Sequence, residues 1–470
     1  MVQKSSSFED SPLWPEVLNI VNSGEKKTLS DYKGTVHTEK EDIAIWELRS
    51  CETTRNYVSD IGDAAKVVFT MGLGDYTNRL YPYRQNLEFT LKRTPMDSTG
   101  SDRAINSPVT VMRYKAIFNG DRNPPVGGSE LESLNSEDLN ISSVVEIHLE
   151  LVDRCLEPLR IKTTGGSYRK VTPAMLIRSL LGEESAGVKV DGKPAIQGMD
   201  LVEPDNKEVI NNAVIPHGTG ITALPTYLQQ TVGGVYNAGI GTYFQTFEGK
   251  KMWFVYPLYS TERFDTKDKR VIFYAVPQEK LPQLDRSWRQ DGNVLKVAVT
   301  AQRRYNDTAE LGFMNEGSGF RVADARAFMK KPVEITKDGI QAARGRLNHE
   351  VIIKSRKDGL NYAPVNKSGP SSNPFAARSS VQARNVAQLD LVWENADIDK
   401  IYPGMPCKYI YLSQGKAISL KGTVLFVHGF TARVERQNAS AFRMTCRLTI
   451  ACETQTKVPD LPVKEAIGNA

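Results

Sequence analysis

Residues 86–94 read Asn-Leu-Glu-Phe-Thr-Leu-Lys-Arg-Thr, a stretch that alternates strictly between polar and apolar side chains. Leu87, Phe89 and Leu91 share one face, because successive side chains of a β-strand point to opposite sides. This alternation predicts a strand with one buried and one exposed face. Such strands are typical of antiparallel sheets that face water on one side.

The same pattern continues on both sides of this stretch. Residues 35–48, 64–71, 109–118 and 143–152 have alternating or β-branched content. Several short strands within the first third of a chain predict an antiparallel barrel or sandwich. We therefore expect the N-terminal part of the protein to be a β-domain.

The middle of the chain mixes helix and strand signals. Thr172 and Pro173 precede an apolar run that stops at Gly182, which predicts a short helix with a threonine N-cap. A second short helix is expected over Leu224–Gln230. Strands are expected at 270–276 and 294–300, where β-branched residues recur.

A glycine-rich stretch, 233–241, leads into an aromatic β-hairpin. Residues 242–247 and 252–259 are the expected strands, and Glu248-Gly249-Lys250 is the expected turn. The aromatic side chains fit either of two roles, a contact with a neighbouring subunit or the core of a middle domain. The candidate interface residues are Tyr243, Phe244, Phe247, Trp253, Phe254 and Tyr256.

The last third returns to strands after a long polar region. Residues 304–345 are polar and glycine-rich, with a helix expected near 338–346. Residues 354–384 are basic and lack apolar spacing, so we interpret them as a mobile arm that contacts a subunit, stays free or touches DNA. Between 388 and 452, short alternating runs predict a β-meander.

Length and charge limit the class of protein. The 470 residues suffice for two to four domains, and no apolar run is long enough to cross a membrane. The N-terminus lacks the order of a signal peptide, so we expect synthesis and folding in the cytoplasm. The net charge of +5 comes from 60 basic and 55 acidic residues, a balance unlike that of a dedicated nucleic-acid binder.

The sequence offers no metal site or cofactor motif. Its five cysteines include no Cys-x-x-Cys pair, and its five histidines are scattered, whereas structural zinc needs closely spaced ligands. We expect reduced, mostly buried thiols. The glycines at 233–241 do not follow the dinucleotide-binding pattern. No metal, cofactor or small-molecule substrate is therefore predicted.

One segment resembles part of a catalytic motif. Residues 424–428 followed by Gly429 resemble the oxyanion-loop strand of α/β-hydrolases. That fold also requires a Gly-x-Ser-x-Gly nucleophile elbow, which the sequence lacks. We interpret the segment as a strand that ends at a glycine turn, assign no catalytic residue and expect a protein that is not an enzyme.

Two segments resemble the central hub proteins of bacteriophage tail baseplates. In residues 214–259, a proline-bearing lead enters a short helix, a glycine-rich turn and a strand pair. In residues 402–450, Tyr-Pro-Gly-Met-Pro sets the first of the closing strands of a C-terminal barrel. The resemblance implies a mainly β fold with some α, in which two tail-tube-like antiparallel barrels flank a mixed α/β middle region.

The resemblance also implies a function and partners. It implies a homotrimer in the virion tail that joins the tail tube to the spike and the baseplate wedge proteins. Genomic DNA would pass through its channel without specific binding, and membrane contact would be indirect, during infection. The hub pattern favours a contractile tail.

The pattern and the resemblance together divide the chain into six regions. These are an N-terminal arm (1–30), a first barrel (31–160), a mixed middle domain (161–300), a loop- and helix-rich insertion with the basic arm (301–387), strands completing a second barrel (388–455) and a C-terminal tail (456–470).

Three other functions stay open at this point. Another tail component, such as a tube, tube-terminator or wedge protein, would have one barrel rather than two. A tail-associated cell-wall hydrolase would need a cleft with convergent carboxylates. A DNA-binding neck or packaging protein would lose duplex affinity steeply as salt rises.

Overall fold

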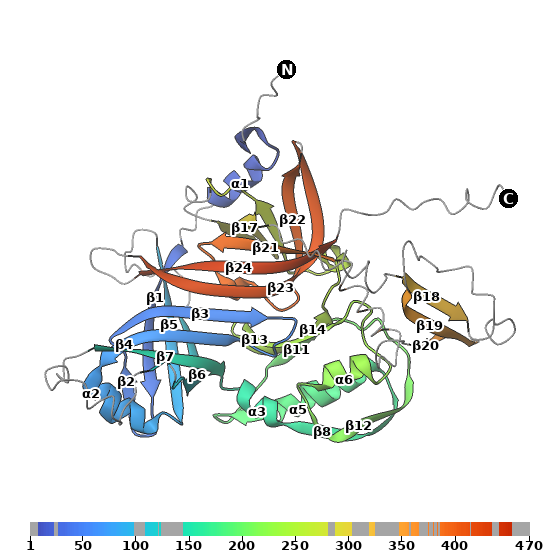
Figure 1. Ribbon diagram of the computed structural model, residues 1–470, viewed down its shortest axis with the longest axis horizontal. Helices are drawn as coiled ribbons and strands as arrows, with labels where there is room; N and C mark the ends of the chain where they lie inside the picture. The colour runs from blue at the N-terminus through green and yellow to red at the C-terminus, as the bar shows by residue number, and fades with distance from the viewer. Residues whose placement is uncertain are drawn as a thin grey trace.

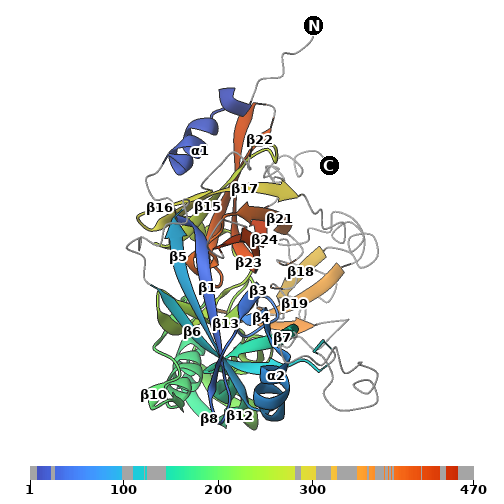
Figure 2. The same ribbon diagram turned by 90° about the vertical axis from the view of Figure 1, so that its left-hand side faces the viewer.

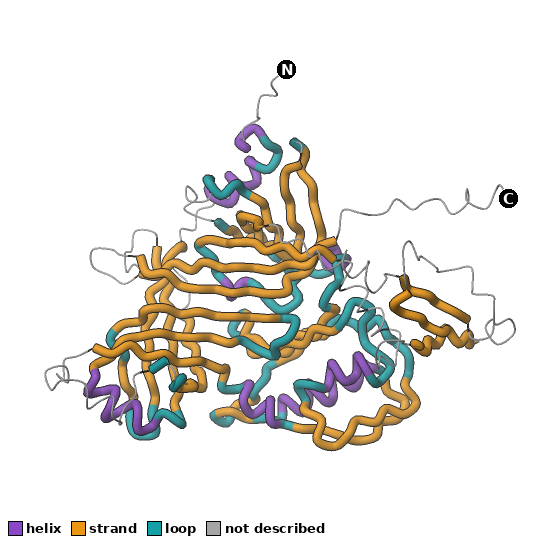
Figure 3. Tube along the Cα trace, viewed as in Figure 1, coloured by secondary structure: helices purple, strands orange, loops and turns teal. Residues whose placement is uncertain are grey.

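The computed structural model describes residues 8–22, 27–97, 109–120, 122–123, 144–280, 287–302, 319–324, 347–356, 359–365, 375, 379, 383, 386–413, 415–434 and 441–453. The fold is mainly β with a few short helices, as the sequence predicts (Figure 3). Among the described residues, no helix is both long and apolar enough to span a bilayer.

A 14-stranded sheet dominates the molecule. Its strands are β1 (Lys27–His37), β2 (Asp42–Ala44), β3 (Glu47–Asn56), β4 (Ala64–Gly72), β5 (Leu87–Asp97), β6 (Thr110–Phe118), β7 (Val144–Asp153), β15 (Arg270–Ala275), β16 (Trp288–Asp291), β17 (Val294–Gln302), β21 (Val386–Glu394), β22 (Pro406–Ser413), β23 (Lys416–Val434) and β24 (Ala441–Glu453).

Two groups of strands in this sheet each form a closed series of paired strands, which we call the first and the second circuit. The first circuit runs β3, β4, β7, β6, β5, β1, β24, β23 and back to β3. The second circuit runs β15, β22, β23, β24, β21, β17 and back to β15. Both circuits contain β23 and β24, which Figure 1 shows side by side across the molecule.

The pairing is antiparallel in both circuits except around β15. This strand is parallel to β17 and to β22, which differs from the all-antiparallel expectation. Strand β15 can be parallel to its neighbours because the chain enters it from the middle region through residues 258–269 and not through a tight hairpin.

Strand β23 is the element that joins the two circuits. Its 19 residues pair with β22 over Lys416–Thr423 and with β3 over Phe426–Phe430. The sequence-based expectation that the strand ends at His428-Gly429 is wrong, since β23 continues to Val434. Gly429 does not form a turn. It allows Ile398 to pack closely against β23, because a Cβ at this position would lie 3.0 Å from Ile398 Cγ2.

Each circuit encloses its own packed interior. Leu87, Phe89 and Leu91 point into the first circuit, as their alternation predicts, and Phe69 stacks on Phe89 with ring centroids 5.8 Å apart. The helical segment of α2 (Leu73–Asp75), η2 (Tyr76–Leu80) and η3 (Tyr81–Tyr83) contributes Tyr76 and Leu80 to this core. These side chains fill this part of the interior.

The middle region consists of small sheets and helices. Its strands are β8 (Thr163–Val171), β9 (Lys189–Val190), β10 (Lys193–Pro194), β11 (Gly198–Leu201), β12 (Ile210–Gly220), β13 (Ile240–Phe247) and β14 (Lys250–Pro257). Its helices are α3 (Leu156–Ile161), α4 (Pro173–Leu176), η4 (Ile177–Glu183), α5 (Glu184–Ala186) and α6 (Leu224–Gln230). Figure 2 shows β8 and β12 at the opposite end of the molecule from α1 (Trp14–Val21).

Two predicted helices are confirmed, one with a different end. Thr172 Oγ1 accepts a hydrogen bond from the Met175 backbone nitrogen at 3.3 Å, so it is the expected N-cap. The helical segment passes through Gly182 and ends at Ala186, beyond the predicted stop. A Cβ at Gly182 would lie 3.2 Å from Met199 Cε, so this glycine allows close packing.

The aromatic hairpin β13–β14 is also confirmed. Glu248 and Gly249 form its two-residue turn, both with positive φ, at 50° and 76°. This is the backbone of a type I′ turn, whose twist matches that of the flanking strands.

Part of the predicted mobile arm is ordered as sheet. Residues 347–356 and 359–365 form the antiparallel pair β19 (Leu347–Arg356) and β20 (Gly359–Val365), and β18 (Gly319–Asp324) lies parallel to β19. The run Val351-Ile-Ile353 supplies the β-branched residues that favour a strand. The helix expected near 338–346 lies outside the described residues.

Candidate functional site

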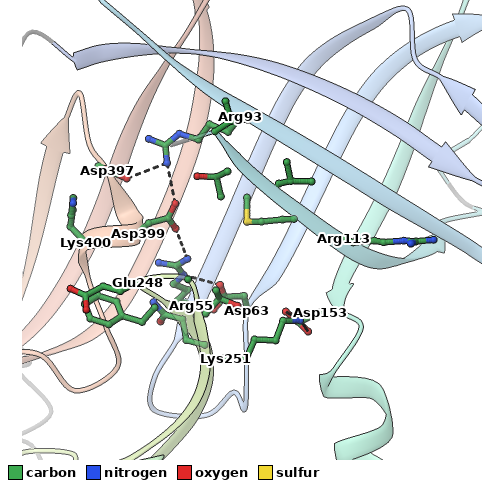
Figure 4. Close-up of a pocket in the computed structure, with 18 of the residues that line it drawn as sticks. Arg55, Asp63, Arg93, Arg113, Asp153, Glu248, Lys251, Asp397, Asp399 and Lys400 are labelled. Carbon is green, nitrogen blue, oxygen red and sulfur yellow. Dashed lines mark hydrogen bonds and ion pairs between the residues drawn. The ribbon is translucent and has the colours of Figure 1, made fainter. Parts of the chain in front are cut away.

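A cavity of about 1320 Å³ lies where the first circuit, the β13–β14 hairpin and the β21–β22 connection meet. We call it the junction cavity. It is lined by both charged and apolar side chains, and Figure 4 labels Arg55, Asp63, Arg93, Arg113, Asp153, Glu248, Lys251, Asp397, Asp399 and Lys400 among them.

Arg55 on β3 is the most deeply buried charge of the site. Its side chain is 4% exposed, and its Nε donates to Asp63 Oδ2 at 3.0 Å. Its Nη1 donates to the Ile398 carbonyl oxygen at 2.7 Å, and its Nη2 donates to Asp399 Oδ1 at 3.1 Å. A guanidinium satisfied from several directions can be buried without large cost.

Arg93 on β5 binds the same carboxylate from the other side. Its Nη1 lies 3.0 Å from Asp399 Oδ2 and 3.1 Å from Asp397 Oδ1, while its Nε donates to Ser30 Oγ at 3.1 Å. Figure 4 shows Asp399 between the two guanidinium groups. We call Arg55, Asp63, Arg93, Asp397 and Asp399 the arginine–aspartate bridge.

The charges of the bridge stabilise one another. Burial alone would raise the pKa of Asp399, but Arg55 and Arg93 outweigh burial and lower that pKa below the ordinary value of an aspartate. Asp397 and Asp399 flank or belong to η7 (Ile398–Lys400), which follows β21. The bridge therefore ties β3 and β5 of the first circuit to a turn of the second.

A second charge pair lies at the edge of the cavity. Lys251 Nζ lies 2.8 Å from Asp153 Oδ1 and 3.1 Å from Cys155 Sγ. Burial lowers the pKa of Lys251, yet Asp153 and Cys155 more than offset it, so the pKa is raised. Burial raises the pKa of the Cys155 thiol, and a protonated thiol is a poor nucleophile.

The geometry of these charged groups suits a structural role better than proton transfer. The acidic and basic side chains of the bridge bind each other, which leaves them unsuited to general acid or base catalysis. Within the described part of the chain, no three histidine, cysteine or acidic side chains lie close enough to bind a metal ion.

Five of the six aromatic residues predicted for a subunit interface are buried in the chain itself. Tyr243, Phe254 and Tyr256 belong to the core of the second circuit, whereas Phe244 and Trp253 belong to the core of the middle region. The hairpin lies between two cores, and for this reason both of its faces are covered. Phe247 remains partly exposed, where it packs on Tyr402 with ring centroids 5.3 Å apart.

The outer surface of the large sheet is a second candidate site. One row crosses both circuits through paired positions, Glu150 to Lys66, Lys66 to Glu52, Glu52 to Phe430, Phe430 to Thr445 and Thr445 to Glu394. We call this row and its neighbours His428 and Arg447 the shared face. Arg447 lies over the Phe430 ring at 5.8 Å, and Lys66 Nζ lies 3.8 Å from Glu150 Oε1.

Sequence reasoning missed both the bridge and the shared face. A signal for Arg93 was nevertheless present, because Arg93 continues the inward register of Leu87, Phe89 and Leu91. A charge at an inward position near a strand end indicates a buried partner. The partner, Asp399, lies 306 residues further along the chain, and no local pattern identifies it.

Comparison with known proteins gives likeness of fold alone. No protein-family model and no curated protein matches the chain. Among solved structures, the chain is similar to a tail protein of Neisseria meningitidis MC58, with a TM-score of 0.40, 9% identity and coverage of 89% of this chain and 96% of that one.

The 43 kDa tail protein of prophage MuSo2 from Shewanella oneidensis is also similar, with a TM-score of 0.42, 10% identity and coverage of 90% and 100%. An E. coli component of the type VI secretion system has a TM-score of 0.41, 7% identity and coverage of 89% and 77%. At these levels the likenesses assign neither a family nor a function to this chain.

Proposed function

We propose that the chain is a structural subunit of a bacteriophage tail, the central baseplate hub that joins the tail tube to the spike and the surrounding wedge proteins. The observation that carries this proposal is the pair of closed strand circuits that share β23 and β24. Each circuit is interpreted as one tube-like barrel. A homotrimer would then present six barrels, which suits a sixfold tube on one side and a threefold spike on the other.

The shared face is the surface we assign to the channel. Strands of both circuits contribute to it without a break, so a ring of subunits could present a continuous β-wall to the lumen. The row carries charges of both signs, with Lys66 between Glu52 and Glu150 and a further acidic residue at Glu394. A surface of mixed sign lets DNA pass without the counterion release that drives tight binding.

The arginine–aspartate bridge fits a subunit that must keep its shape under load. It fixes the first circuit to the β21–β22 turn by charge-assisted hydrogen bonds from two arginines, the strong class of hydrogen bond. A rigid connection keeps the two barrels in one relative orientation, which a ring with alternating barrels requires. The bridge is thus interpreted as a positioning device.

The direct test is the oligomeric state and shape of the purified chain. Sedimentation velocity is expected to give a trimer, and electron microscopy a threefold ring with a central channel. Binding of the ring to a spike protein would add support. A compact monomer that assembles with no tail protein would contradict the hub. Lysis of cell walls in a zymogram, lost when clustered acids are substituted, would favour a hydrolase instead.

A further inference from the structure

The β8–β12 ribbon of the middle region has an outer edge that no described strand covers. Strand β8 pairs with β12 alone, and every residue from 144 to 280 is described. One side of the ribbon is fixed, because Ala213 and Ile215 are buried in the core of the middle region. The ribbon therefore holds an open strand edge in place, and such an edge can accept a further strand.

The same edge carries positive charge that the described part of the chain does not neutralise. Arg169 and Lys170 on β8 and Arg160 on α3 are exposed, and none of the three forms an ion pair with a described residue. Lys162, at the start of the strand, does have a partner, with Glu184 at 3.0 Å. Opposite charges on paired strands attract, so this edge favours an acidic strand.

Apolar side chains stand beside these charges. Ile161 precedes β8 and is 77% exposed, while Val214 is 60% exposed on β12, opposite Ser167. Covering aliphatic side chains removes apolar surface from water, which stabilises a complex. A partner strand that combines acidic and aliphatic side chains matches both features of the edge.

The chain itself contains a stretch of this composition. Residues 129–140 read Ser-Glu-Leu-Glu-Ser-Leu-Asn-Ser-Glu-Asp-Leu-Asn, with four acidic residues, three leucines and no basic residue. No proline interrupts them, and Glu130, Leu131 and Glu132 alternate as in a strand. We call residues 129–140, which lie outside the described residues, the acidic segment.

The described residues on either side of the acidic segment lie toward the other end of the molecule from the ribbon. Asn123 binds the backbone of His148 on β7, and Val144 pairs with Gly72, next to α2. Figure 1 shows α2 at one end of the long axis and β8 and β12 in the other half. A head-to-tail arrangement of copies brings the acidic segment of one copy to the ribbon of the next, and such arrangements can close into rings.

We propose that the outer edge of β8 binds the acidic segment of a second copy of this chain, which adds to the β8–β12 ribbon as a third strand. Main-chain hydrogen bonds to β8 supply affinity, and Arg169 and Lys170 select acidic side chains. In the proposed hub, each copy gives one segment and receives one. The inference rests on the proposed function only in that both require copies of the chain to associate.

The test is charge reversal in the whole chain, followed by sedimentation velocity over a concentration series. The edge variant, Arg169→Glu with Lys170→Glu, should weaken self-association about tenfold or more relative to the parent, because attractive charge pairs become repulsive. The segment variant, Glu130→Lys with Glu132→Lys, should weaken self-association to a similar extent. The two variants change different parts of the proposed contact, so each checks the other.

A control variant has the same change in net charge as the edge variant. Lys189→Glu with Lys250→Glu changes exposed lysines on β9 and β14, which belong to other sheets, and should associate like the parent. The decisive sample combines the edge and segment substitutions in one chain, and it should regain the association constant of the parent. A combined variant as weak as the edge variant would overturn the proposal, as would a folded edge variant that associates like the parent.

A mixture of the edge and segment variants identifies which copy supplies the segment. Each variant carries a complementary partner for the other, so equal amounts of both should associate more tightly than either alone. If the segment binds the ribbon of its own copy, mixing adds nothing and the proposal fails.

The same data separate this contact from the hub. A trimeric parent with an equally trimeric edge variant would remove the contact and leave the hub in place. A parent that forms charge-dependent dimers would keep the contact and remove the hub trimer. A parent that stays monomeric at every concentration would contradict both.

Discussion

Arg55 shows how one residue can connect distant parts of the chain. Its guanidinium binds Asp63 nearby in sequence, but it also binds the Ile398 carbonyl oxygen and Asp399, more than 340 residues away. In β3, Cys51 and Arg55 are both buried and share the inward face. The sequence from Glu52 to Asn56 is polar at every position and gives no sign of this burial, so only the folded chain identifies Arg55 and its partners.

The first prediction concerns this residue. Arg55→Met should lower the free energy of unfolding by about 3 kcal/mol, the lower end of the cost of breaking a buried ion pair, because Asp63 loses its arginine while Asp399 keeps Arg93. Urea titration followed by circular dichroism measures the change. Arg49→Met is the control, because Arg49 lies on the same strand with a 48% exposed side chain. Equal effects of the two substitutions would contradict a special role for Arg55.

Asp399 gives a prediction for pH. Arg55 and Arg93 lower its pKa in the folded state, so the folded state favours the ionised form. The resulting stabilisation is fully present above the ordinary pKa of aspartate and is lost as pH falls through the folded pKa. The stability gap between the parent and Asp399→Asn should therefore narrow as urea titrations move from pH 7 toward pH 3. If the difference in free energy of unfolding between the two proteins does not change with pH, the ionised Asp399 of the bridge is not the cause of that difference.

At the level of elements, the sequence predicts strands better than their ends. The alternation of residues 86–94 gives β5 and its buried face correctly, and the hairpin β13–β14 follows from its turn residues. The end of β23 was missed because Gly429 reads as a turn, although it serves close contact with Ile398. Glycine has both roles in strands, and the choice depends on a neighbour far away in the sequence.

Gly422 on β23 provides the prediction at this scale. A Cβ there would lie 2.1 Å from the Ala451 carbonyl oxygen on β24, and that backbone cannot move without breaking the strand pair. Gly422→Ala should lower the thermal midpoint by several degrees, equivalent to about 3 kcal/mol of overpacking. Gly120→Ala is the matched control, since nothing lies within 4 Å of an added Cβ there. An unchanged midpoint in Gly422→Ala would refute the close approach of β23 and β24.

The hairpin turn offers a change in the opposite direction. Glu248 has a φ of 50°, which most side chains avoid and which asparagine tolerates. Glu248→Asn should raise the free energy of unfolding by up to about 1 kcal/mol, because the unfavourable backbone conformation is relieved. Thr246→Asn, two residues before Glu248 on β13, should give no such gain. A loss of stability in Glu248→Asn would show that the ion pair with Lys269 matters more than the backbone.

At the scale of the whole molecule, the arrangement of positive and negative side chains on the shared face determines how the protein meets DNA. Replacing Glu52 and Glu150 by lysine would make the row around Lys66 uniformly basic. The double variant should bind duplex DNA at least tenfold more tightly than the parent, with a steeper fall in affinity as salt rises, because more phosphates are neutralised. Fluorescence anisotropy over a salt series measures both. Parallel salt slopes for the two proteins would argue against a face that meets DNA.

Most of the global arrangement was beyond reach from the sequence. Strand content could be predicted, but the sharing of β23 and β24 could not, because alternation specifies which face is buried and not which strand lies beside which. The aromatic residues of the hairpin illustrate the limit. Aromatic side chains are common both in subunit interfaces and in protein cores, so the sequence leaves both roles open. The structure decides between the roles, because Trp253 packs in the core of the middle region and Phe254 packs in the core of the second circuit.

The sharing of β23 and β24 has a consequence for biosynthesis. The first circuit begins with β1 at Lys27, yet it closes through strands that end at Glu453. At typical translation rates of 5–20 residues per second, the ribosome needs roughly 15–60 s after β7 to deliver them. During that interval β1 and β3 lack their last partners, so the first circuit cannot close until residues 416–453 have been synthesised.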